Sequence, residues 1–291
     1  MDWQIDILTF IQQFKHPALD VFFEAVTMSA EEIFFILAAG WLLWCHDKQL
    51  GYRLGFALLT SATINPVIKH IVRFERPIGL EGIVSERLHT ATGFSFPSGH
   101  TQGATAFWTG LMTSVRRRWL TVAGCAMILL VALSRLYLGV HWLTDVLGGI
   151  ACGLAWVLAC NALFDYAKRL RRPWLLGLLL LPLAGACVVI NLGGYDKDLT
   201  VAFAVAVGFW LGYVVEERYI HFNVRTRRFL QFLKLLVGLA ILVALKEGLK
   251  ILLPFPTIAT DSIRYGLMGF WISAGAPATF KLLKLDGPAT A

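Results

Sequence analysis

The sequence predicts an all-α fold, a polytopic transmembrane helical bundle of about nine spans. Of its 291 residues 57% are hydrophobic and only 15% are charged, and the mean hydropathy is +0.66. Soluble domains carry about 25% charged residues, so this composition indicates an integral membrane protein. The opening residues, MDWQIDILTF, are acidic where a signal peptide would be basic, so we expect the apolar segments themselves to direct insertion.

A helix needs roughly 20 apolar residues to cross a bilayer. Stretches of this kind predict spans near residues 29–46, 51–71, 99–115, 119–138, 141–164, 174–192, 199–217, 235–253 and 262–280. Residues 1–28 contain polar side chains too often to span, and we expect them to form an amphipathic segment at the membrane interface. The rest of the chain then divides into a core over 29–165 and additional C-terminal transmembrane helices over 166–291.

The basic residues predict the orientation of these spans. Connections on one side of the predicted bundle carry 16 of the 26 Lys and Arg residues, which by the positive-inside rule makes that side cytoplasmic and puts the N-terminus outside. These residues are dispersed among short loops, so the net charge of +7 predicts no nucleic-acid partner. On the opposite side several cations lie within apolar helix ends, where charge is costly and usually functional.

The first polar segment on that outer side is KHIVRFERP, from Lys69 to Pro77. Lys69 and Arg76 are seven residues apart, about two helical turns, so we expect both side chains to point the same way until Pro77 stops the helix. Arginine offers planar paired donors and lysine a point charge. The pair therefore suits an anion with several oxygens.

The second segment is GFSFPSGHTQ, at the mouth of the third predicted span. Ser98 is a good N-cap, Gly99 lets a ligand approach the backbone, and His100 falls in the first helical turn. Free backbone N–H groups at a helix start attract anions. We expect His100 to donate a proton beside such an anion.

The third segment is SRLYLGVHWLTD, where Arg135 ends the fourth predicted span and a short hinge through Gly139 leads to His141. Asp145 follows His141 by four residues, one helical turn, and lies on the same face. A carboxylate there accepts one ring N–H and leaves the other nitrogen as a nucleophile.

These three segments resemble the signature of the phosphatidic acid phosphatase type 2 (PAP2) superfamily, Lys-x6-Arg-Pro, Pro-Ser-Gly-His and Ser-Arg-x5-His-x3-Asp, without departure over residues 69–145. The resemblance implies a phosphatase core over 29–165. It implies that His141 attacks phosphorus to form a phosphohistidine, with Asp145 orienting it, and that His100 protonates the leaving group. It further implies that the phosphoryl oxygens are held by Lys69, Arg76, Ser98, Gly99 and Arg135.

The same resemblance implies a reaction without a metal ion or other cofactor. The sequence offers no carboxylate cluster, and its five cysteines lack metal-ligand spacing. We expect the substrate to be a lipid phosphate or diphosphate, with a polyprenyl diphosphate favoured because a basic, outward-facing pocket suits carrier-lipid recycling. In a bacterium the site would face the exterior of the cytoplasmic membrane.

Two alternatives to a lipid phosphatase remain open. The nine-span layout with an outward N-terminus also resembles the glucose-6-phosphatase branch, whose substrate is a soluble sugar phosphate. A lipid transporter or scaffold with a vestigial site belongs to a different class of protein. Both histidines and Asp145 stand in the motif, which argues against loss of activity.

Overall fold

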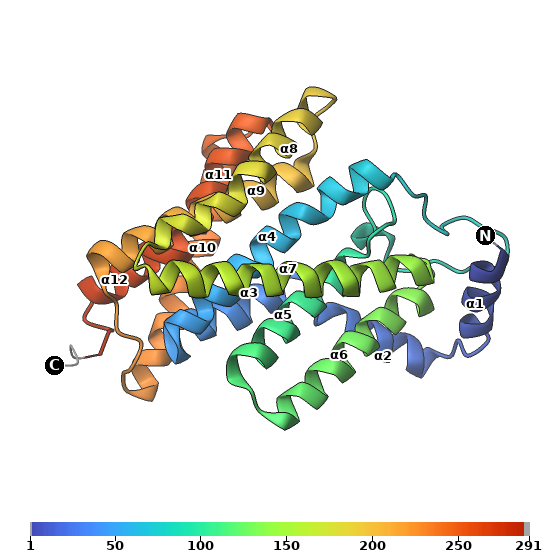
Figure 1. Ribbon diagram of the computed structural model, residues 1–291, viewed down its shortest axis with the longest axis horizontal. Helices are drawn as coiled ribbons and strands as arrows, with labels where there is room; N and C mark the ends of the chain where they lie inside the picture. The colour runs from blue at the N-terminus through green and yellow to red at the C-terminus, as the bar shows by residue number, and fades with distance from the viewer. Residues whose placement is uncertain (1, 288–291) are drawn as a thin grey trace. The chain divides into compact units, whose positions relative to one another are not determined.

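The computed structural model describes residues 2–287, and over this range the chain forms helices and loops without any β-strand. The predicted all-α fold is therefore confirmed (Figure 1). The α-helices are α1 (Asp2–Gln12), α2 (Pro17–Met28), α3 (Glu32–Trp41), α4 (Lys48–Val72), α5 (Gly99–Val115), α6 (Arg118–Tyr137), α7 (Leu143–Arg169), α8 (Leu180–Leu192), α9 (Lys197–Val215), α10 (Arg228–Leu252), α11 (Ile258–Phe270) and α12 (Ala276–Leu282). Short helical turns are η1 (Leu42–His46), η2 (Leu88–Thr90), η3 (Pro173–Leu179), η4 (Glu216–Ile220) and η5 (Trp271–Gly275).

Every predicted span coincides with one of these helices or with consecutive helical segments. Within residues 2–287, five helical stretches are long and apolar enough to cross a membrane, namely Arg118–Tyr137, Leu143–Arg169, Pro173–Leu192, Lys197–Ile220 and Arg228–Leu252. The remaining predicted spans are shorter or more polar, so the total of nine crossings stays a prediction. The predicted N-terminal segment forms α1 and α2, and its position at the membrane interface stays a prediction. The division of the chain into 1–28, 29–165 and 166–291 also stays a prediction. Residue 1 of the first segment and residues 288–291 of the last lie outside the described range.

The chain folds as two compact units. Of the described residues, one unit comprises 2–35 and 65–158, and the other comprises 36–64 and 159–287. Helices α3, α4 and α7 each contribute residues to both units. The three signature segments belong entirely to the first unit, so that unit alone has to explain the site.

Helices α5 and α6 form an antiparallel hairpin in the first unit (Figure 1). Arg116 adopts a left-handed conformation (φ 52°) and its N–H donates to the carbonyl of Met112 at 3.1 Å, which ends α5. A Cβ at Gly124 of α6 would lie 2.8 Å from the sulfur of Met112, so a larger residue there would displace the Met112 side chain of α5. The hairpin returns the end of α6, with Arg135, to the start of α5, with His100.

Helix α7 packs against the start of α5 through glycines spaced four residues apart, the pattern that allows close helix contact in membranes. A Cβ at Gly149 would lie 2.8 Å from the carbonyl oxygen of Ser98, and a Cβ at Gly153 would lie 2.8 Å from that of Gln102. Backbone therefore meets backbone across this contact. It places the first turn of α7 beside the first turn of α5.

The N-terminal helices complete the core of the first unit. Leu8 of α1 packs with Leu136 and Trp142, and Phe23 of α2 packs with Tyr137 and Val140. Each of these side chains is buried. Apolar burial thus binds α1 and α2 to the segment that joins α6 to α7, and stabilises the turn from which His141 projects.

The end of α4 differs from the prediction that Pro77 stops the helix. Helix α4 ends at Val72, and the next residue, Arg73, has a left-handed φ of 53° with its N–H donating to the carbonyl of Lys69 at 2.9 Å. Such a residue closes the last helical turn and cannot continue it. Arg76 consequently lies in the loop after α4, so the prediction that one helical face carries both Lys69 and Arg76 is wrong.

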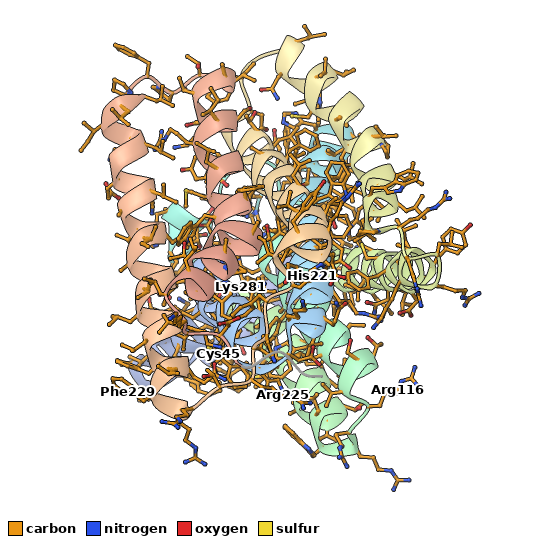
Figure 2. All side chains as sticks on the ribbon, turned by 90° about the vertical axis from the view of Figure 1, so that its left-hand side faces the viewer. Cys45, Arg116, His221, Arg225, Phe229 and Lys281 are labelled. Carbon is orange, nitrogen blue, oxygen red and sulfur yellow. The ribbon has the colours of Figure 1, made fainter. Side chains whose placement is uncertain are left out.

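The second unit contains buried polar contacts of its own. The Tyr52 hydroxyl donates to the carbonyl of Ser273 at 2.6 Å, and Lys234 donates to the carbonyl of Val224 at 2.8 Å. Figure 2 shows Lys281 beside His221, and the Lys281 ammonium donates to the carbonyl of Ile220 at 2.5 Å. These bonds satisfy backbone carbonyls within the unit.

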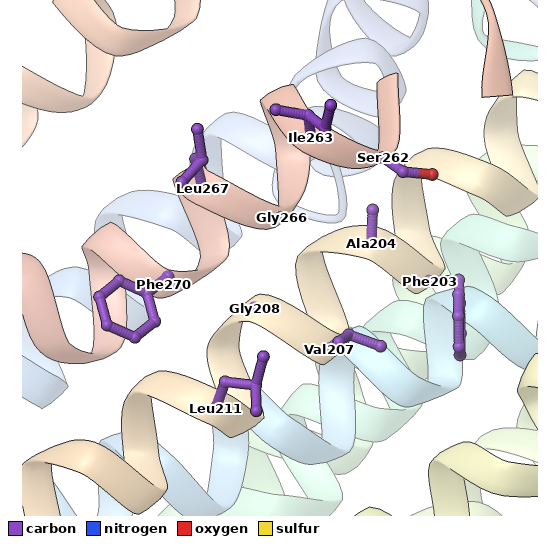
Figure 3. Close-up of a pocket in the computed structure, with 10 residues that line it drawn as sticks. All are labelled: Phe203, Ala204, Val207, Gly208, Leu211, Ser262, Ile263, Gly266, Leu267 and Phe270. Atoms are coloured by element: carbon purple, nitrogen blue, oxygen red, sulfur yellow. The ribbon is translucent and has the colours of Figure 1, made fainter. Parts of the chain in front are cut away.

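Helices α9 and α11 of the second unit approach closely through glycines, since a Cβ at Gly208 would lie 1.9 Å from the carbonyl oxygen of Gly266. Beside this contact an apolar groove opens between the two helices (Figure 3). Its large lining side chains are Phe203, Val207, Leu211, Ile263, Leu267 and Phe270.

We expect Gly153→Ala to destabilise the protein. The new methyl group would meet the backbone of Gln102, and relieving such overpacking costs about 1–3 kcal/mol. Gly185→Ala is the matched control, because a Cβ at this α8 position meets nothing within 4 Å. Thermal unfolding in detergent should show a lower midpoint for Gly153→Ala only; equal midpoints for the two variants would contradict the close contact of α5 with α7.

Candidate active site

The ends of four helices meet in the first unit and carry the predicted site residues. Lys69 lies in the last turn of α4, His100 in the first turn of α5, Arg135 in the last turn of α6, and Asp145 in the first turn of α7. The loop after α4 contributes Arg76. The structure thus gathers all eight predicted residues, Lys69, Arg76, Ser98, Gly99, His100, Arg135, His141 and Asp145, at one end of these helices.

His141 and Asp145 form a buried pair, as the spacing predicts. The His141 side chain is 2% exposed and that of Asp145 is fully buried, and Nδ1 of His141 lies 3.2 Å from Oδ2 of Asp145. The same carboxylate oxygen accepts the backbone N–H of Trp142 at 2.7 Å. Gly139, with a φ of 65°, permits the turn that delivers His141 to this position.

Arg76 decides which nitrogen of His141 carries the proton. Its Nη1 lies 3.1 Å from Nε2 of His141, and a guanidinium can only donate hydrogen bonds. Nε2 is therefore the acceptor, and the ring proton resides on Nδ1, facing Asp145. The neutral ring presents an unprotonated Nε2 to the site.

Arg76 also organises the loop around it. Its guanidinium donates to the carbonyls of Gly93 (2.9 Å), Thr92 (2.7 Å), Phe94 (3.3 Å) and Val140 (2.9 Å). Because five N–H donors meet these acceptors and His141, the segment 92–94 folds round the cation. An incoming anion therefore has to compete with backbone carbonyls for this guanidinium.

The other two predicted cations point toward the same region. The Lys69 ammonium donates to the carbonyl of Thr92 at 3.2 Å, the same oxygen that Arg76 contacts. Arg135 is fully buried, and its Nη1 donates to the hydroxyl of Thr27 at 3.0 Å. Its Nε has no hydrogen-bond partner. A buried guanidinium with an unsatisfied donor favours an acceptor such as a phosphoryl oxygen.

Ser98 occupies the N-cap position of α5, as predicted, although its side chain makes no capping bond. Its hydroxyl instead accepts a hydrogen bond from Thr101 at 3.1 Å, and its backbone N–H donates to the carbonyl of Asp145 at 3.0 Å. A Cβ at Gly99 would lie 3.4 Å from Oδ1 of Asn65.

Sequence reasoning missed Ser95 and Glu31. The Ser95 hydroxyl donates to Oδ2 of Asp145 and lies 3.3 Å from Nδ1 of His141. Glu31, between α2 and α3, has Oε1 3.9 Å from Nε2 of His100. Glu31 stands outside the three signature segments, and Ser95 lies in the second segment but outside its Pro-Ser-Gly-His motif. Only the folded loop and the docked N-terminal helices reveal their contacts.

Burial and neighbouring charges shift the pKa values of His141 and Arg76. Burial, reinforced by Arg76, Arg135 and Lys69, lowers the pKa of His141 well below its ordinary value. Burial also lowers the pKa of Arg76 to about 10, although Asp145 opposes this shift. His141 is consequently neutral at pH 7, as a nucleophile has to be.

Within residues 2–287 no three His, Cys, Asp or Glu side chains are grouped closely enough to hold a metal ion. The metal-free reaction that the resemblance implies stays a prediction.

Replacing Arg76 by lysine should lower the free energy of unfolding by about 2–4 kcal/mol, because one ammonium cannot reach the carbonyls that the planar fork spans. Arg73→Lys is the control, since the hydrogen bond found for the Arg73 side chain goes to the carbonyl of His70, three residues earlier. Thermal unfolding in detergent without phosphate measures both. Equal stability of the two variants would mean that Arg76 does not organise the loop.

Two models of one family match this chain. The model described as "PAP2 superfamily" matches residues 50–169, and that described as "PAP2 superfamily phosphatase, transmembrane extension" matches residues 200–289. Together they cover more than half of the chain and include every predicted site residue.

Individual relatives agree with these matches. Phosphatidylglycerophosphatase B of Bacillus subtilis is 30% identical over 122 residues, which are 39% of this chain and 57% of the relative. An undecaprenyl-diphosphatase of Sulfolobus acidocaldarius is 28% identical over 128 residues, which are 44% of this chain and 61% of the relative. The chain therefore spans less than two thirds of the length of either relative.

A solved structure shares the fold. The crystal structure of Aquifex aeolicus LpxE superposes with a TM-score of 0.50 and 24% sequence identity, covering 55% of this chain and 95% of LpxE. The two family models match the part of the chain in which His141, Asp145, His100 and the cations assemble at one end of the helices, and five helices in the described part of the chain are long and apolar enough to cross a membrane. This chain is therefore an integral membrane protein of the PAP2 superfamily.

Proposed function

We propose that this protein is a phosphatase that hydrolyses a lipid phosphate or diphosphate, with His141 as the nucleophile and without a metal ion. The observation that carries the proposal is the state of His141. Its Nδ1 lies 3.2 Å from Asp145 and its Nε2 lies 3.1 Å from the Arg76 guanidinium, which can only donate, so we assign the ring proton to Nδ1. A neutral nucleophile among cations is suited to attack on a phosphoryl group.

In the first step Nε2 of His141 attacks phosphorus, and the bond from phosphorus to the leaving oxygen breaks. The leaving oxygen keeps the electron pair and takes a proton from His100, while the imidazolium of His141 is stabilised by Asp145. Lys69, Arg76 and Arg135 hold the phosphoryl oxygens, together with Ser98 and the backbone N–H groups near Gly99. Because the Arg76 guanidinium donates to backbone carbonyls in the structure, it has to give up some of these hydrogen bonds to bind the phosphoryl oxygens.

In the second step water attacks the phosphohistidine, gives a proton to the now neutral His100, and the bond between phosphorus and Nε2 breaks. Inorganic phosphate leaves, and both histidines return to their starting states. The same two imidazoles therefore serve both halves of the reaction, and no electron donor or acceptor is required.

A polyprenyl diphosphate is the favoured substrate. Cations outnumber carboxylates around the site, where Lys69, Arg76, Arg87 and Arg135 face Glu31 and Asp145, which suits an anion bearing more than one charge. The name of the Sulfolobus relative, an undecaprenyl-diphosphatase, supports this choice, and the name of the Bacillus relative keeps phosphatidylglycerol phosphate as the competing lipid.

The proposed site faces the exterior, in a bacterium the outer side of the cytoplasmic membrane. The ends of α4 and α6 and the starts of α5 and α7 carry the site, and the basic loops that follow α5 and α7 lie at the opposite helix ends. Substrates could then reach it sideways from the lipid head-group layer.

The first test is phosphate release by detergent-purified protein in the presence of a chelator. The substrates are polyprenyl diphosphate, phosphatidylglycerol phosphate, phosphatidate and glucose 6-phosphate. We expect release from a lipid that falls by at least about 10⁴-fold in His141→Ala and by about 10³–10⁴-fold in Asp145→Asn, which loses the required tautomer. Release that survives in His141→Ala, or preference for glucose 6-phosphate, would overturn the proposal.

The rate should also fall on acidification at a lower pH than an ordinary histidine predicts. A free histidine is half protonated near about pH 6.5. Because the pKa of His141 is lowered, the neutral nucleophile persists below that pH and the acid limb of kcat lies lower.

In Arg135→Gln one facing cation is lost, so protonation of His141 becomes easier and the acid limb should move to higher pH. The remaining groups that face His141 are Arg76, Lys69, His100 and Asp145. An acid limb near pH 6.5 in the wild type, unchanged in Arg135→Gln, would contradict this electrostatic account.

A further inference from the structure

His100 has a buried ring nitrogen that lacks a hydrogen bond. Its side chain is 14% exposed, and Nε2 has no hydrogen-bond partner. Oε1 of Glu31 lies 3.9 Å from this nitrogen, whereas a hydrogen bond needs about 2.7–3.2 Å. Catalytic hydrogen bonds are often long before substrate binds and shorten in the reacting complex. A small side-chain movement would join the two groups.

Glu31 is held in place from the other side. Nη2 of Arg87 donates to the same Oε1 at 2.6 Å, and the backbone N–H of Glu31 donates to the carbonyl of Met28 at 3.2 Å in the turn between α2 and α3. His100 and Arg87 lower the pKa of Glu31 to about 2, so this carboxylate is ionised at every pH of interest. A fixed negative charge therefore stands beside His100.

The cations around His100 disfavour its protonated form, and the Glu31 carboxylate offsets their effect. Arg135 and Lys69 are the cations that face the ring, and both disfavour its protonated form. Glu31 is the facing group of opposite sign. Without it, a histidine among cations would hold its proton poorly, although protonating a leaving oxygen requires that proton.

We propose that Glu31 is the positioning residue of His100, orienting the ring and favouring its protonated form as the leaving group departs. The inference rests on the proposed function and adds to it a residue from the N-terminal helices. When the bond from phosphorus to the leaving oxygen breaks, the proton passes from His100 to that oxygen. The ring becomes neutral, and Glu31 stays ionised throughout.

The test uses the dependence of the rate on the leaving group. An alkoxide leaves phosphorus only when it is protonated, whereas p-nitrophenolate leaves without help. Release from phosphatidate and from p-nitrophenyl phosphate is therefore measured for the wild type, Glu31→Gln and Glu31→Asp, with His100→Ala as the reference for loss of the acid. Glu32→Gln is the matched control, since the neighbouring carboxylate is exposed.

We expect Glu31→Gln to lower kcat for phosphatidate at least about tenfold more than kcat for p-nitrophenyl phosphate. His100→Ala should change this ratio in the same direction, Glu31→Asp should restore part of it, and Glu32→Gln should leave it unchanged. Because both rates come from one preparation, their ratio does not depend on the fraction of folded protein.

Equal losses on both substrates, or no loss on either, would overturn the role of Glu31 while leaving the phosphatase intact. Absence of phosphate release in the wild type would instead reject the proposed function. The two failures are thus distinguishable.

Discussion

The close contact of α7 with the start of α5 is the constraint on which the site depends. Helix α7 presents no side chain at Gly149 and Gly153, so the carbonyls of Ser98 and Gln102 lie close to its backbone. The contact lets the Ser98 N–H donate to the carbonyl of Asp145 at 3.0 Å. A displacement of either helix would separate the proposed nucleophile from the proposed acid, because the two histidines belong to different helix ends.

A second organising interaction is the guanidinium of Arg76, which the loop encloses with its carbonyl oxygens. The loop is tied to the N-terminal helices by two ion pairs, Lys15 to Glu86 at 2.6 Å and Arg87 to Glu31 at 2.6 Å. The N-terminal helices are therefore part of the architecture that supports the site, and Glu31 gives them a chemical connection to it.

Electrostatics link this architecture to the proposed reaction. Concentrating cations at buried positions is unfavourable until an anion binds. The buried Nε of Arg135, which has no hydrogen-bond partner, is a donor that a bound anion could satisfy. The same field keeps His141 neutral and would favour loss of the proton of His100. The two carboxylates have different proposed roles. Asp145 accepts the Nδ1 proton of the neutral His141 ring, and Glu31 lies where it can stabilise the protonated His100 ring.

The sequence by itself determined the all-α class, the helical segments and the pairing of His141 with Asp145, because a separation of four residues has one geometry around a helix start. It also predicted that Lys69 and Arg76 lie together, although the reason was wrong, since α4 ends at Val72 and the loop after it brings Arg76 back beside Lys69. Only the tertiary structure decided the contacts of Ser95 and Glu31. These join residues far apart in the chain, and which of them meet depends on how glycine faces, apolar helix surfaces and loop hydrogen bonds pack together, which residue spacing does not encode.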